Sequence, residues 1–379
     1  MHARRSLLVG LFALGLSSSS VGCDPGAPTT SDASTDAPSA LDAGATPDAP
    51  LRSDAGPLPG FDVPRDRTWH YVELEGAVCA NGTPLGIGLN LDPSSDRLLV
   101  FLQGGGACWD LATCLYLETA AHLTDTLDEA TVLGEAEGAG GFILDRDDMA
   151  NPYRDQSFVY VPYCTGDVHV GDHETVYSSP RSSRTVQHRG ARNTEILLAR
   201  LATTFPALDR LTMAGESAGG YGVAINAFRG RLAFPDARVD VLDDSGILVD
   251  AMEDQWATML ESWQPPLPAD CPECLVRLSN VLPYYARTMR EGERFAIFAS
   301  REDETIRTYF SYSPELMAMR VDAMVASIAA YDNEAVFVND GAQHVLLGRP
   351  TLETSDGTSV REWVTAFATD DPAWGTVGP

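Results

Sequence analysis

Six short, continuous apolar segments recur along the chain, and none of them alternates cleanly between apolar and polar residues. They are residues 97–104, 157–164, 210–216, 239–242, 295–299 and 335–338. Runs of this kind indicate strands that are buried on both faces, as in a parallel sheet. Helical periodicity lies between them, for example over residues 193–205 and 314–330. The sequence therefore predicts an α/β fold, with a mostly parallel central sheet and helices on both faces.

One of these strands runs directly into a G-x-S-x-G sequence, Gly215-Glu216-Ser217-Ala218-Gly219. In this pattern the serine occupies a tight strand-to-helix turn, and the two glycines leave room for it. A helix is predicted to begin at Ala218. We interpret Ser217 as a catalytic nucleophile, with a glycine-rich turn that has no catalytic role as the alternative.

A nucleophilic serine needs a base and an orienting acid, which follow it in the order acid, then histidine, in the α/β hydrolases. His344 is the one histidine after Ser217 in the whole sequence, and it follows the last predicted strand. We therefore predict that His344 is the base. Asp303 follows the strand at 295–299 and is the acid that we favour. The other candidate acids are Asp244, Glu302 and Glu304.

Three consecutive glycines, Gly104 to Gly106, end the strand at 97–104. Glycines allow backbone amides to face a ligand with no side chain in the way. With the amide of Ala218, this loop would form an oxyanion hole. A phosphate-binding role is not expected, because the chain contains no G-x-x-x-x-G-K-[ST] sequence and no lysine.

The charge balance excludes one class of partner. The chain has 26 basic residues, all of them arginine, against 54 acidic ones, for a formal net charge of −28. Nucleic-acid binding needs a basic surface, so it is not expected. A group of acidic and histidine residues in one segment offers possible metal ligands, but we interpret it as the polar rim of a cleft and predict neither a metal nor a cofactor. These residues are Asp167, His169, Asp172 and His173.

The first 23 residues resemble a lipoprotein signal peptide, with an arginine pair, a short apolar stretch and small residues before Cys23. Of residues 24–60, 33 of 37 are Ala, Pro, Asp, Ser, Thr or Gly, which is typical of a disordered tether. We predict a monomeric catalytic domain over residues 61–379, with a cap inserted at about 251–292. The predicted location is extracytoplasmic, on a membrane through lipid on Cys23.

Six cysteines remain after Cys23, and an even number in an exported chain indicates disulfides. Cys271 and Cys274 form a C-x-x-C pair, and Cys108 and Cys114 close a short loop. Elimination leaves Cys79 with Cys164. A single C-x-x-C supplies only two of the four ligands that structural zinc needs, and a redox-active pair is the other alternative.

Several motifs in the same order resemble the pectin acetylesterase family, which is related to the Notum carboxylesterase. They are residues 79–84 (CANGTP), 102–108 (LQGGGAC), Cys114, 162–167 (PYCTGD), 215–220 (GESAGG), 244–246 (DSG) and 343–344 (QH). The resemblance implies an α/β hydrolase that is secreted, contains disulfides and cleaves O-acyl esters. It also implies the roles of Ser217, Asp303 and His344 as nucleophile, acid and base. The oxyanion positions that it implies are Gly105, Gly106 and Ala218.

The chain departs from plant members of this family at Ala107, where they have tryptophan; here Trp109 comes two residues later. That aromatic residue borders the acyl pocket, so the acyl group and the alcohol stay open. We predict a carboxylic-ester hydrolase (EC 3.1.1 type) that acts on acylated carbohydrate. The alternatives are an esterase for a lipid, a polyester or an acylated protein, and an inactive surface-binding lipoprotein that keeps the fold.

Overall fold

The computed structural model describes residues 57–378. The predictions for the signal peptide, for Cys23 and for residues 24–56 of the tether lie outside these residues and stay predictions. No helix in the described range is long and apolar enough to cross a bilayer. Residues 57–378 fall within one compact unit.

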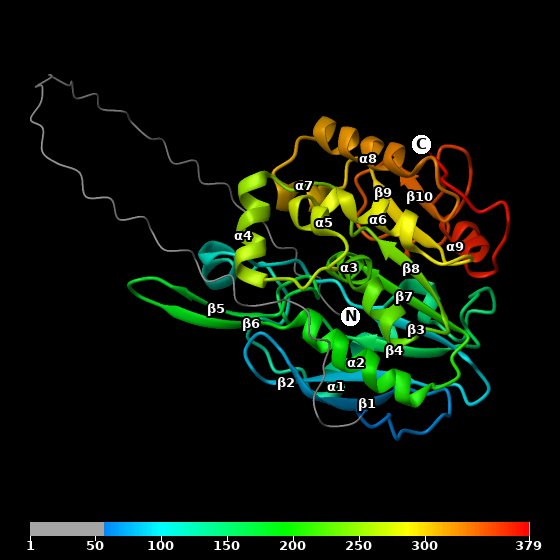
Figure 1. Ribbon diagram of the computed structural model, residues 1–379, viewed down its shortest axis with the longest axis horizontal. Coiled ribbons are helices and arrows are strands. Elements are labelled where there is room, and N and C mark those ends of the chain that lie inside the picture. The colour runs from blue at the N-terminus through cyan, green and yellow to red at the C-terminus, as the bar shows by residue number, and fades with distance from the viewer. Residues whose placement is uncertain (1–56, 379) are drawn as a thin grey trace, which may run out of the picture. The chain divides into compact units, whose positions relative to one another are not determined.

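The centre of the described chain is an eight-stranded sheet, with strand order β1-β2-β4-β3-β7-β8-β9-β10 (Figure 1). The strands are β1 (His70–Val78), β2 (Pro84–Asn90), β3 (Arg97–Leu102), β4 (Ser157–Val161), β7 (Arg210–Glu216), β8 (Arg238–Asp244), β9 (Phe295–Ser300) and β10 (Glu334–Asn339). The six strands from β4 to β10 in this order are parallel, while β2 is antiparallel to both of its neighbours. The predicted mostly parallel α/β-hydrolase sheet is confirmed.

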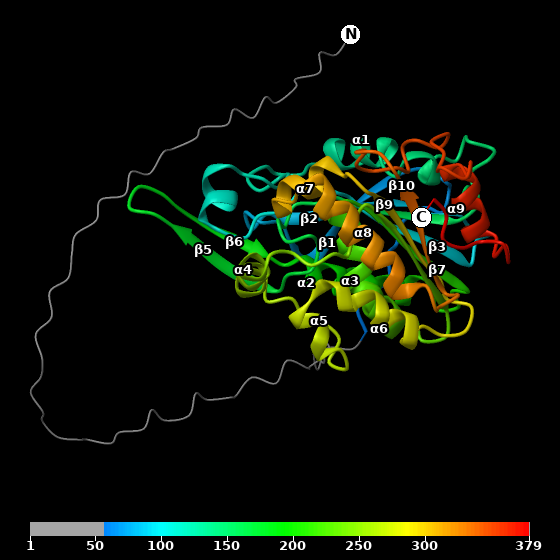
Figure 2. The same ribbon diagram turned by 90° about the horizontal axis from the view of Figure 1, so that it is seen from above.

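Helices cover both faces of this sheet. They are α1 (Glu129–Gly138), α2 (Gly190–Thr204), α3 (Ala218–Ala233), α4 (Glu253–Trp263), α5 (Pro272–Val276), α6 (Val281–Thr288), α7 (Glu304–Phe310), α8 (Pro314–Ile328) and α9 (Val360–Ala368), with the short η1 (Ala112–Tyr116), η2 (Gly141–Leu144) and η3 (Leu278–Asn280). In Figure 2, α1 and α9 lie on one side, and α2, α3 and α6 on the other. The segment predicted as a cap, between β8 and β9, contains α4, α5, η3 and α6.

Helices α3 and α9 are held against the sheet by their buried side chains. Most of α3 is buried, and this helix follows β7 directly and packs on β3, β7 and β8. Helix α9 buries one apolar stripe and begins with a capping box, in which Ser359 and Glu362 exchange hydrogen bonds with each other's backbone. Trp363 of α9 stacks on Phe298 of β9 and Phe337 of β10, at ring-centroid distances of 5.0 and 5.8 Å. The aromatic contacts fix α9 against the far edge of the sheet.

Two hairpins were not predicted from the apolar runs. The β1–β2 pair forms the outer edge of the sheet, and β1 is only partly buried. The second pair, β5 (His173–Ser178) with β6 (Ser183–His188), forms a separate two-stranded sheet that extends from the body in Figure 1. Both contain strands with polar residues facing solvent, so a search for continuous apolar segments misses them.

The six cysteines form the three expected disulfides: Cys79–Cys164, Cys108–Cys114 and Cys271–Cys274. The first joins the turn between β1 and β2 to the segment after β4. It closes the longest loop, because its cysteines are 85 residues apart, against 6 and 3 for the other two. A longer closed loop removes more conformational entropy from the unfolded chain.

Removing the first disulfide should therefore cost the most stability. Replacing both Cys79 and Cys164 by serine is expected to lower the free energy of unfolding by about 4.5 kcal/mol, against about 2 kcal/mol for the matched pair Cys271 and Cys274. Urea unfolding of both double variants without reductant measures the difference. Equal losses would contradict the chain-entropy argument.

Candidate active site

Ser217 lies in the turn that joins β7 to α3. Its backbone has φ 54° and ψ −117°, a conformation that residues other than glycine rarely adopt. The amide of Ser217 donates a hydrogen bond to the carbonyl oxygen of Asp244 at 2.7 Å, and the carbonyl oxygen of Ser217 accepts one from the amide of Tyr221 at 3.1 Å. The turn therefore has the strained strand-to-helix geometry of a nucleophile elbow.

The outer glycines of this turn are required by close backbone contacts. A Cβ atom on Gly215 would lie 2.3 Å from the carbonyl oxygen of Gly219, and a Cβ atom on Gly219 would lie 1.9 Å from that of Leu102. Both contacts are with backbone, so no side-chain rotation can relieve them. The second contact places the elbow directly against the end of β3, where the glycine loop begins.

His344 and Asp303 come together from two loops at the same end of the sheet. Nδ1 of His344 lies 2.8 Å from Oδ2 of Asp303. The other carboxylate oxygen accepts a hydrogen bond from the amide of Ile306 at 2.9 Å, so Asp303 is also the N-cap of α7. Nε2 of His344 is buried and has no hydrogen-bond partner among residues 57–378. A carboxylate thus orients one side of the imidazole, and the nitrogen on the other side has no partner within the described chain.

The carboxylate of Asp244 is occupied by the backbone of the histidine loop. It accepts hydrogen bonds from the amide of Leu346 at 2.9 Å and from that of Leu347 at 2.8 Å. The two remaining candidate acids are exposed: Glu302 and Glu304. Of the four carboxylates considered from the sequence, Asp303 is bonded to the imidazole of His344, whereas Asp244 holds the loop that carries it.

The glycine loop lies against the elbow. A Cβ atom on Gly104 would come within 2.9 Å of the Cβ atom of Ser217. Gly105 and Gly106 have φ values of 154° and 78°, which disfavour any side chain. The carbonyl oxygen of Gly105 accepts from the amide of Ala121 at 2.8 Å, but no backbone hydrogen bond in the described chain uses the amides of Gly105 and Gly106 outside regular elements. These amides are free to face a ligand.

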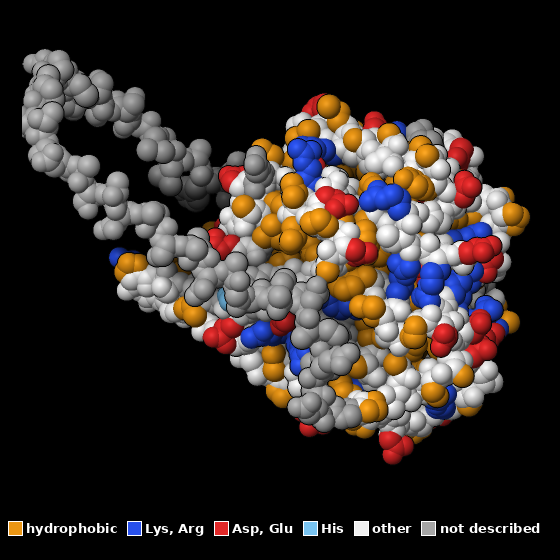
Figure 3. Space-filling model, viewed as in Figure 1, with side chains coloured by type: hydrophobic (Ala, Val, Ile, Leu, Met, Phe, Trp, Pro, Cys, Tyr) orange, Lys and Arg blue, Asp and Glu red, His pale blue; other side chains and the backbone are white. Residues whose placement is uncertain are grey.

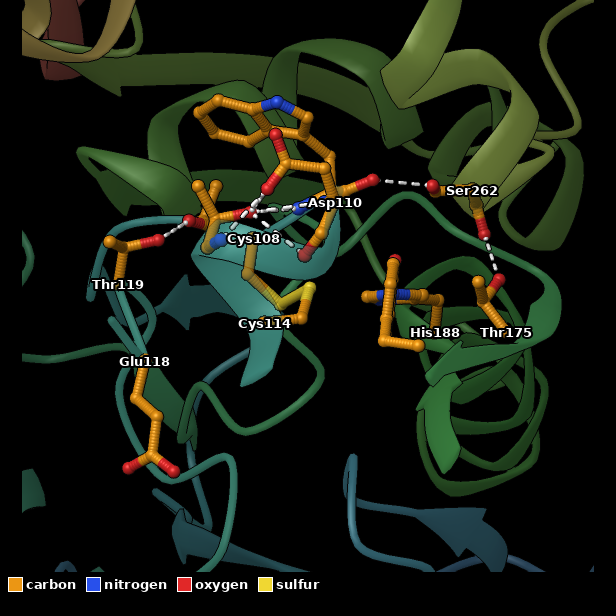
Figure 4. Close-up of a disulfide and its surroundings, with 12 residues drawn as sticks. Cys108, Asp110, Cys114, Glu118, Thr119, Thr175, His188 and Ser262 are labelled. Atoms are coloured by element: carbon orange, nitrogen blue, oxygen red, sulfur yellow. Dashed lines mark hydrogen bonds between the residues drawn. A yellow bond between two sulfur atoms is a disulfide. The ribbon is translucent and has the colours of Figure 1, made fainter. Parts of the chain in front are cut away.

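The Cys108–Cys114 disulfide closes the loop that follows the glycines, and the cap is attached to it (Figure 4). Nε1 of Trp263 donates to the carbonyl oxygen of Cys108 at 2.8 Å, and Oγ of Ser262 donates to that of Trp109 at 2.5 Å. Both donors lie at the C-terminal end of α4. The cap helix and the glycine loop are therefore joined by direct hydrogen bonds.

The four residues considered as possible metal ligands have other partners. Asp167 and His169 are buried. The carboxylate of Asp167 accepts a hydrogen bond from the amide of Gly190, the first residue of α2, at 2.8 Å. Asp172 forms an ion pair with Arg189 at 2.8 Å. His173 begins β5, where its Nε2 lies 3.3 Å from the side-chain nitrogen of Gln264.

One group of three metal-ligating side chains is close enough to share an ion in the described part of the chain: Cys108, Cys114 and His188. Both sulfur atoms are in the disulfide drawn in Figure 4. The ring nitrogens of His188 are also occupied, one by the carbonyl oxygen of Thr165 at 3.0 Å and one by the hydroxyl of Tyr177 at 2.9 Å. Burial lowers the pKa of His188 to about 4, so its imidazole is neutral.

An apolar pocket of about 60 Å³ lies beside Ser217 and Ala218. Its wall includes side chains from the glycine loop, α3, the cap and α7: Trp109, Ile225, Trp256, Met259, Trp263 and Phe310. All four aromatic residues at these positions of the cap are buried: Tyr284 and Tyr285 pack in the core, whereas Trp256 and Trp263 also line this pocket.

Apolar side chains also gather on the surface where α4, α5 and α7 meet (Figure 3). The exposed ones in this part of the cap are Met252, Leu275 and Val276. The apolar character of the cap therefore extends from the wall of the pocket to the outer surface.

Glu216, directly before the nucleophile, is a titratable group that the sequence analysis did not assign. Burial and the neighbouring Asp244 raise its pKa to about 7, although His344 opposes the shift. The Gly104 amide also opposes the shift, and a Cβ atom on Gly104 would lie 3.3 Å from Cγ of Glu216. An acidic residue between the glycine and the serine of the motif was the available signal, but its burial is a tertiary property.

Comparisons with known proteins agree with this geometry. A model of the pectinacetylesterase family matches residues 68–265. The human palmitoleoyl-protein carboxylesterase NOTUM is 30% identical over 193 residues, which cover 49% of this chain and 37% of that protein. Its Drosophila melanogaster counterpart is 30% identical over 164 residues, 40% of this chain and 22% of that protein. The chain therefore matches well under half of the length of these curated relatives.

A solved structure shares the fold over a longer range. The Wnt deacylase Notum from Drosophila superimposes with a TM-score of 0.61 at 20% identity, over 81% of this chain and 95% of that one. The central sheet, its helices and the elbow define an α/β hydrolase. Since the family match covers more than half of the 379 residues, the chain belongs to the pectinacetylesterase family, whose relatives named above are carboxylesterases.

The close approach of Gly219 to the end of β3 predicts that a larger residue at this position disrupts the elbow. Gly219→Ala should destabilise the protein by about 1–3 kcal/mol through overpacking and should remove most ester hydrolysis, because the elbow must move away from the glycine loop. Gly134→Ala is the matched control: Gly134 is exposed within α1, a Cβ atom there meets nothing within 4 Å, and alanine should stabilise by about 0.5–1 kcal/mol. Thermal unfolding and ester hydrolysis of both variants measure this. An unperturbed Gly219→Ala protein would contradict the geometry.

Proposed function

We propose that this protein is a serine carboxylic-ester hydrolase whose triad is Ser217, His344 and Asp303. The observation that carries the proposal is the 2.8 Å contact between Asp303 and Nδ1 of His344, with Nε2 left unpartnered within the described chain. Asp244 links this loop to the elbow, because its backbone bonds Ser217 and its side chain bonds the residues after the histidine. A binding protein with a retained fold needs none of these contacts.

The reaction would proceed through an acyl-enzyme. Oγ of Ser217 attacks the ester carbonyl carbon while Nε2 of His344 accepts its proton. The amides of Gly105, Gly106 and Ala218 stabilise the negative oxygen of the tetrahedral intermediate. Collapse of this intermediate releases the alcohol, which takes the proton from His344. Water, deprotonated by the same imidazole, then attacks the acyl-serine. The second tetrahedral intermediate breaks its bond to Oγ of Ser217, which takes the proton back from His344, and the carboxylic acid is released.

The acyl group of the substrate is proposed from the pocket. Its wall is apolar, and its volume of about 60 Å³ compares with the roughly 10–15 Å³ that one water molecule occupies on the same measure. This is several times the space that one water molecule needs, so the pocket has room for more than the methyl group of acetate. We therefore propose an ester with a short to medium apolar acyl chain.

The alcohol of the substrate is less constrained. The family description favours an acetylated carbohydrate, which is the second candidate. The names of the relatives refer instead to palmitoleoyl-protein esters and to Wnt deacylation, and favour a longer acyl chain on a protein. The apolar pocket supports acyl chains longer than acetate in either case.

The triad is tested by substitution. Ser217→Ala and His344→Ala should each lower kcat by several orders of magnitude, and the double variant should be hardly worse, because the residues act as a unit. Asp303→Asn is expected to lower kcat by about 10⁴ and Asp244→Asn by much less, since only the first removes the carboxylate bonded to the imidazole. Steady-state kinetics on folded variants decides between the two aspartates. A larger loss for Asp244→Asn would move the acid to β8.

The acyl preference is tested with a series of p-nitrophenyl esters. Each methylene group buried in the pocket is worth about 0.8 kcal/mol, so kcat/KM should rise about fourfold per carbon from acetate and reach its maximum near butyrate or hexanoate. Ala251→Phe adds bulk to the pocket wall and should move the maximum towards acetate, whereas Met319→Phe on exposed α8 should not. A maximum at acetate in the unmodified protein would favour the acetylated-carbohydrate candidate.

A further inference from the structure

The peptide between Gln103 and Gly104 is the first of the glycine loop, at the end of β3. Its carbonyl oxygen accepts a hydrogen bond from Nε2 of His169 at 2.9 Å. Its N–H belongs to Gly104, which lies against the side chain of Glu216: a Cβ atom on Gly104 would come 3.3 Å from Cγ of Glu216, and the Gly104 amide lowers the pKa of that carboxyl group. A trans peptide is planar, and its C=O and N–H point in opposite directions, so His169 and Glu216 face its two polar groups from opposite sides.

The orientation of this peptide matters for the residues that follow. Gly105 and Gly106 have positive φ values and no side chains, so their own conformational preferences do not fix the direction of their amides. Rotation of the preceding peptide plane would be absorbed at Gly104 and Gly105 without a steric penalty from side chains. The direction of the two amides therefore depends on what holds the Gln103–Gly104 peptide.

His169 is itself held in a strained position. Val168 and His169 are consecutive non-glycine residues with φ values of 49° and 62°. The amide of Val168 donates to the hydroxyl of Tyr163 at 2.8 Å, and Nδ2 of Asn226 donates to the carbonyl oxygen of His169 at 2.9 Å. Costly backbone conformations of this kind persist where the surroundings impose them, often at functional sites.

Asp167 completes the support of His169. Its carboxylate is fully buried and accepts hydrogen bonds from Oγ1 of Thr165 at 2.5 Å and from the amides of His169 and Gly171 at 3.1 Å each. Burial lowers the pKa of His169, so the imidazole is neutral. Because Nε2 faces a carbonyl oxygen, the proton of the neutral ring lies on that nitrogen.

We propose that His169 and Glu216 are positioning residues that orient the Gln103–Gly104 peptide and thereby aim the amides of Gly105 and Gly106 at the oxyanion. This inference rests on the proposed function and adds two residues to it. Neither side chain lines the acyl pocket, so both act through the loop and not on the acyl chain. Their loss should therefore lower kcat and leave KM nearly unchanged.

The first test compares His169→Leu with His169→Gln, whose side-chain amide keeps an N–H donor. His169→Leu should lower kcat by about 10²-fold, as the loss of one oxyanion donor does, with KM within about twofold. A trifluoromethyl ketone, which forms a tetrahedral adduct with the serine, should bind about 10²-fold more weakly. His169→Gln should recover most of both values. His188→Leu is the matched control, because His188 is also buried but does not contact Gln103; it should lower stability without lowering kcat.

The second test compares Glu216→Leu with Glu216→Gln, which keeps a carbonyl oxygen for the amide of Gly104. Glu216→Leu should lose kcat as His169→Leu does, and Glu216→Gln should keep most of it. Glu216 faces Asp244, His344 and Tyr160. Burial raises the pKa of Glu216 to about 7, whereas the Glu216→Gln side chain is neutral at every pH. A kcat retained by Glu216→Gln therefore shows that the acceptor oxygen, and not the charge, supports the loop.

The outcomes separate the two proposals. An unmodified protein that hydrolyses no ester and fails to react with a fluorophosphonate would overturn both. An active protein in which folded His169→Leu keeps more than half of its kcat would overturn the positioning role alone. So would equal losses in His169→Leu and His169→Gln, because a donor would then be irrelevant.

Discussion

The backbone and side chain of Asp244 together hold the nucleophile elbow and the histidine loop in one place. Its carbonyl oxygen accepts from the amide of Ser217 at 2.7 Å, and its carboxylate accepts from the amides of Leu346 and Leu347. The residue is fully buried, and burial raises the pKa of its carboxyl group. A buried carboxylate without partners would cost several kcal/mol, and these backbone donors offset that cost. Asp244 and Leu346 are 102 residues apart in the sequence.

Parallel pairing brings the other parts of the site to the same edge. In register, Leu102 of β3 pairs with Gly215 of β7, and Glu216 of β7 pairs with Asp244 of β8. The carboxyl ends of these strands are therefore level, and the loops that leave them meet above the sheet. The glycine loop, the elbow and the residues that hold the histidine loop therefore meet without long connecting segments. Because the sheet itself brings them together, the segment between β8 and β9 can contain a large cap.

The parts of the structure that were predictable are those with a local signal. The central strands are continuous apolar runs, and Ser217 lies in a motif whose glycines are required by contacts of 2.3 and 1.9 Å. The edge strand β1 and the β5–β6 hairpin are half polar, so their sequences resemble loops. His344 was identifiable because no other histidine follows the serine.

The acid could not be decided from the sequence, because Asp244 and Asp303 both follow strands. Only the fold shows that one carboxylate faces backbone amides and the other faces the imidazole. The positioning roles proposed for Glu216 and His169 were not predicted, for a related reason. Both roles depend on the Gln103–Gly104 peptide. Glu216 is next to the nucleophile in the sequence, whereas His169 lies in a loop 66 residues after Gln103. No spacing rule connects such residues.

Residues of the glycine loop and of the cap line the same apolar pocket, so the proposed binding of an acyl chain there would also affect the loop. Trp109 and Trp263 line the pocket, and the carbonyl oxygens of Cys108 and Trp109 accept hydrogen bonds from the end of α4. An acyl chain that packs against α4 would therefore stabilise the same segment that follows the glycine amides. Binding energy from the non-reacting part of a substrate raises kcat when it helps to align the reacting groups. In the proposed reaction a longer acyl chain would therefore contribute to alignment as well as affinity, because the cap is bonded directly to the residues that follow the glycine loop.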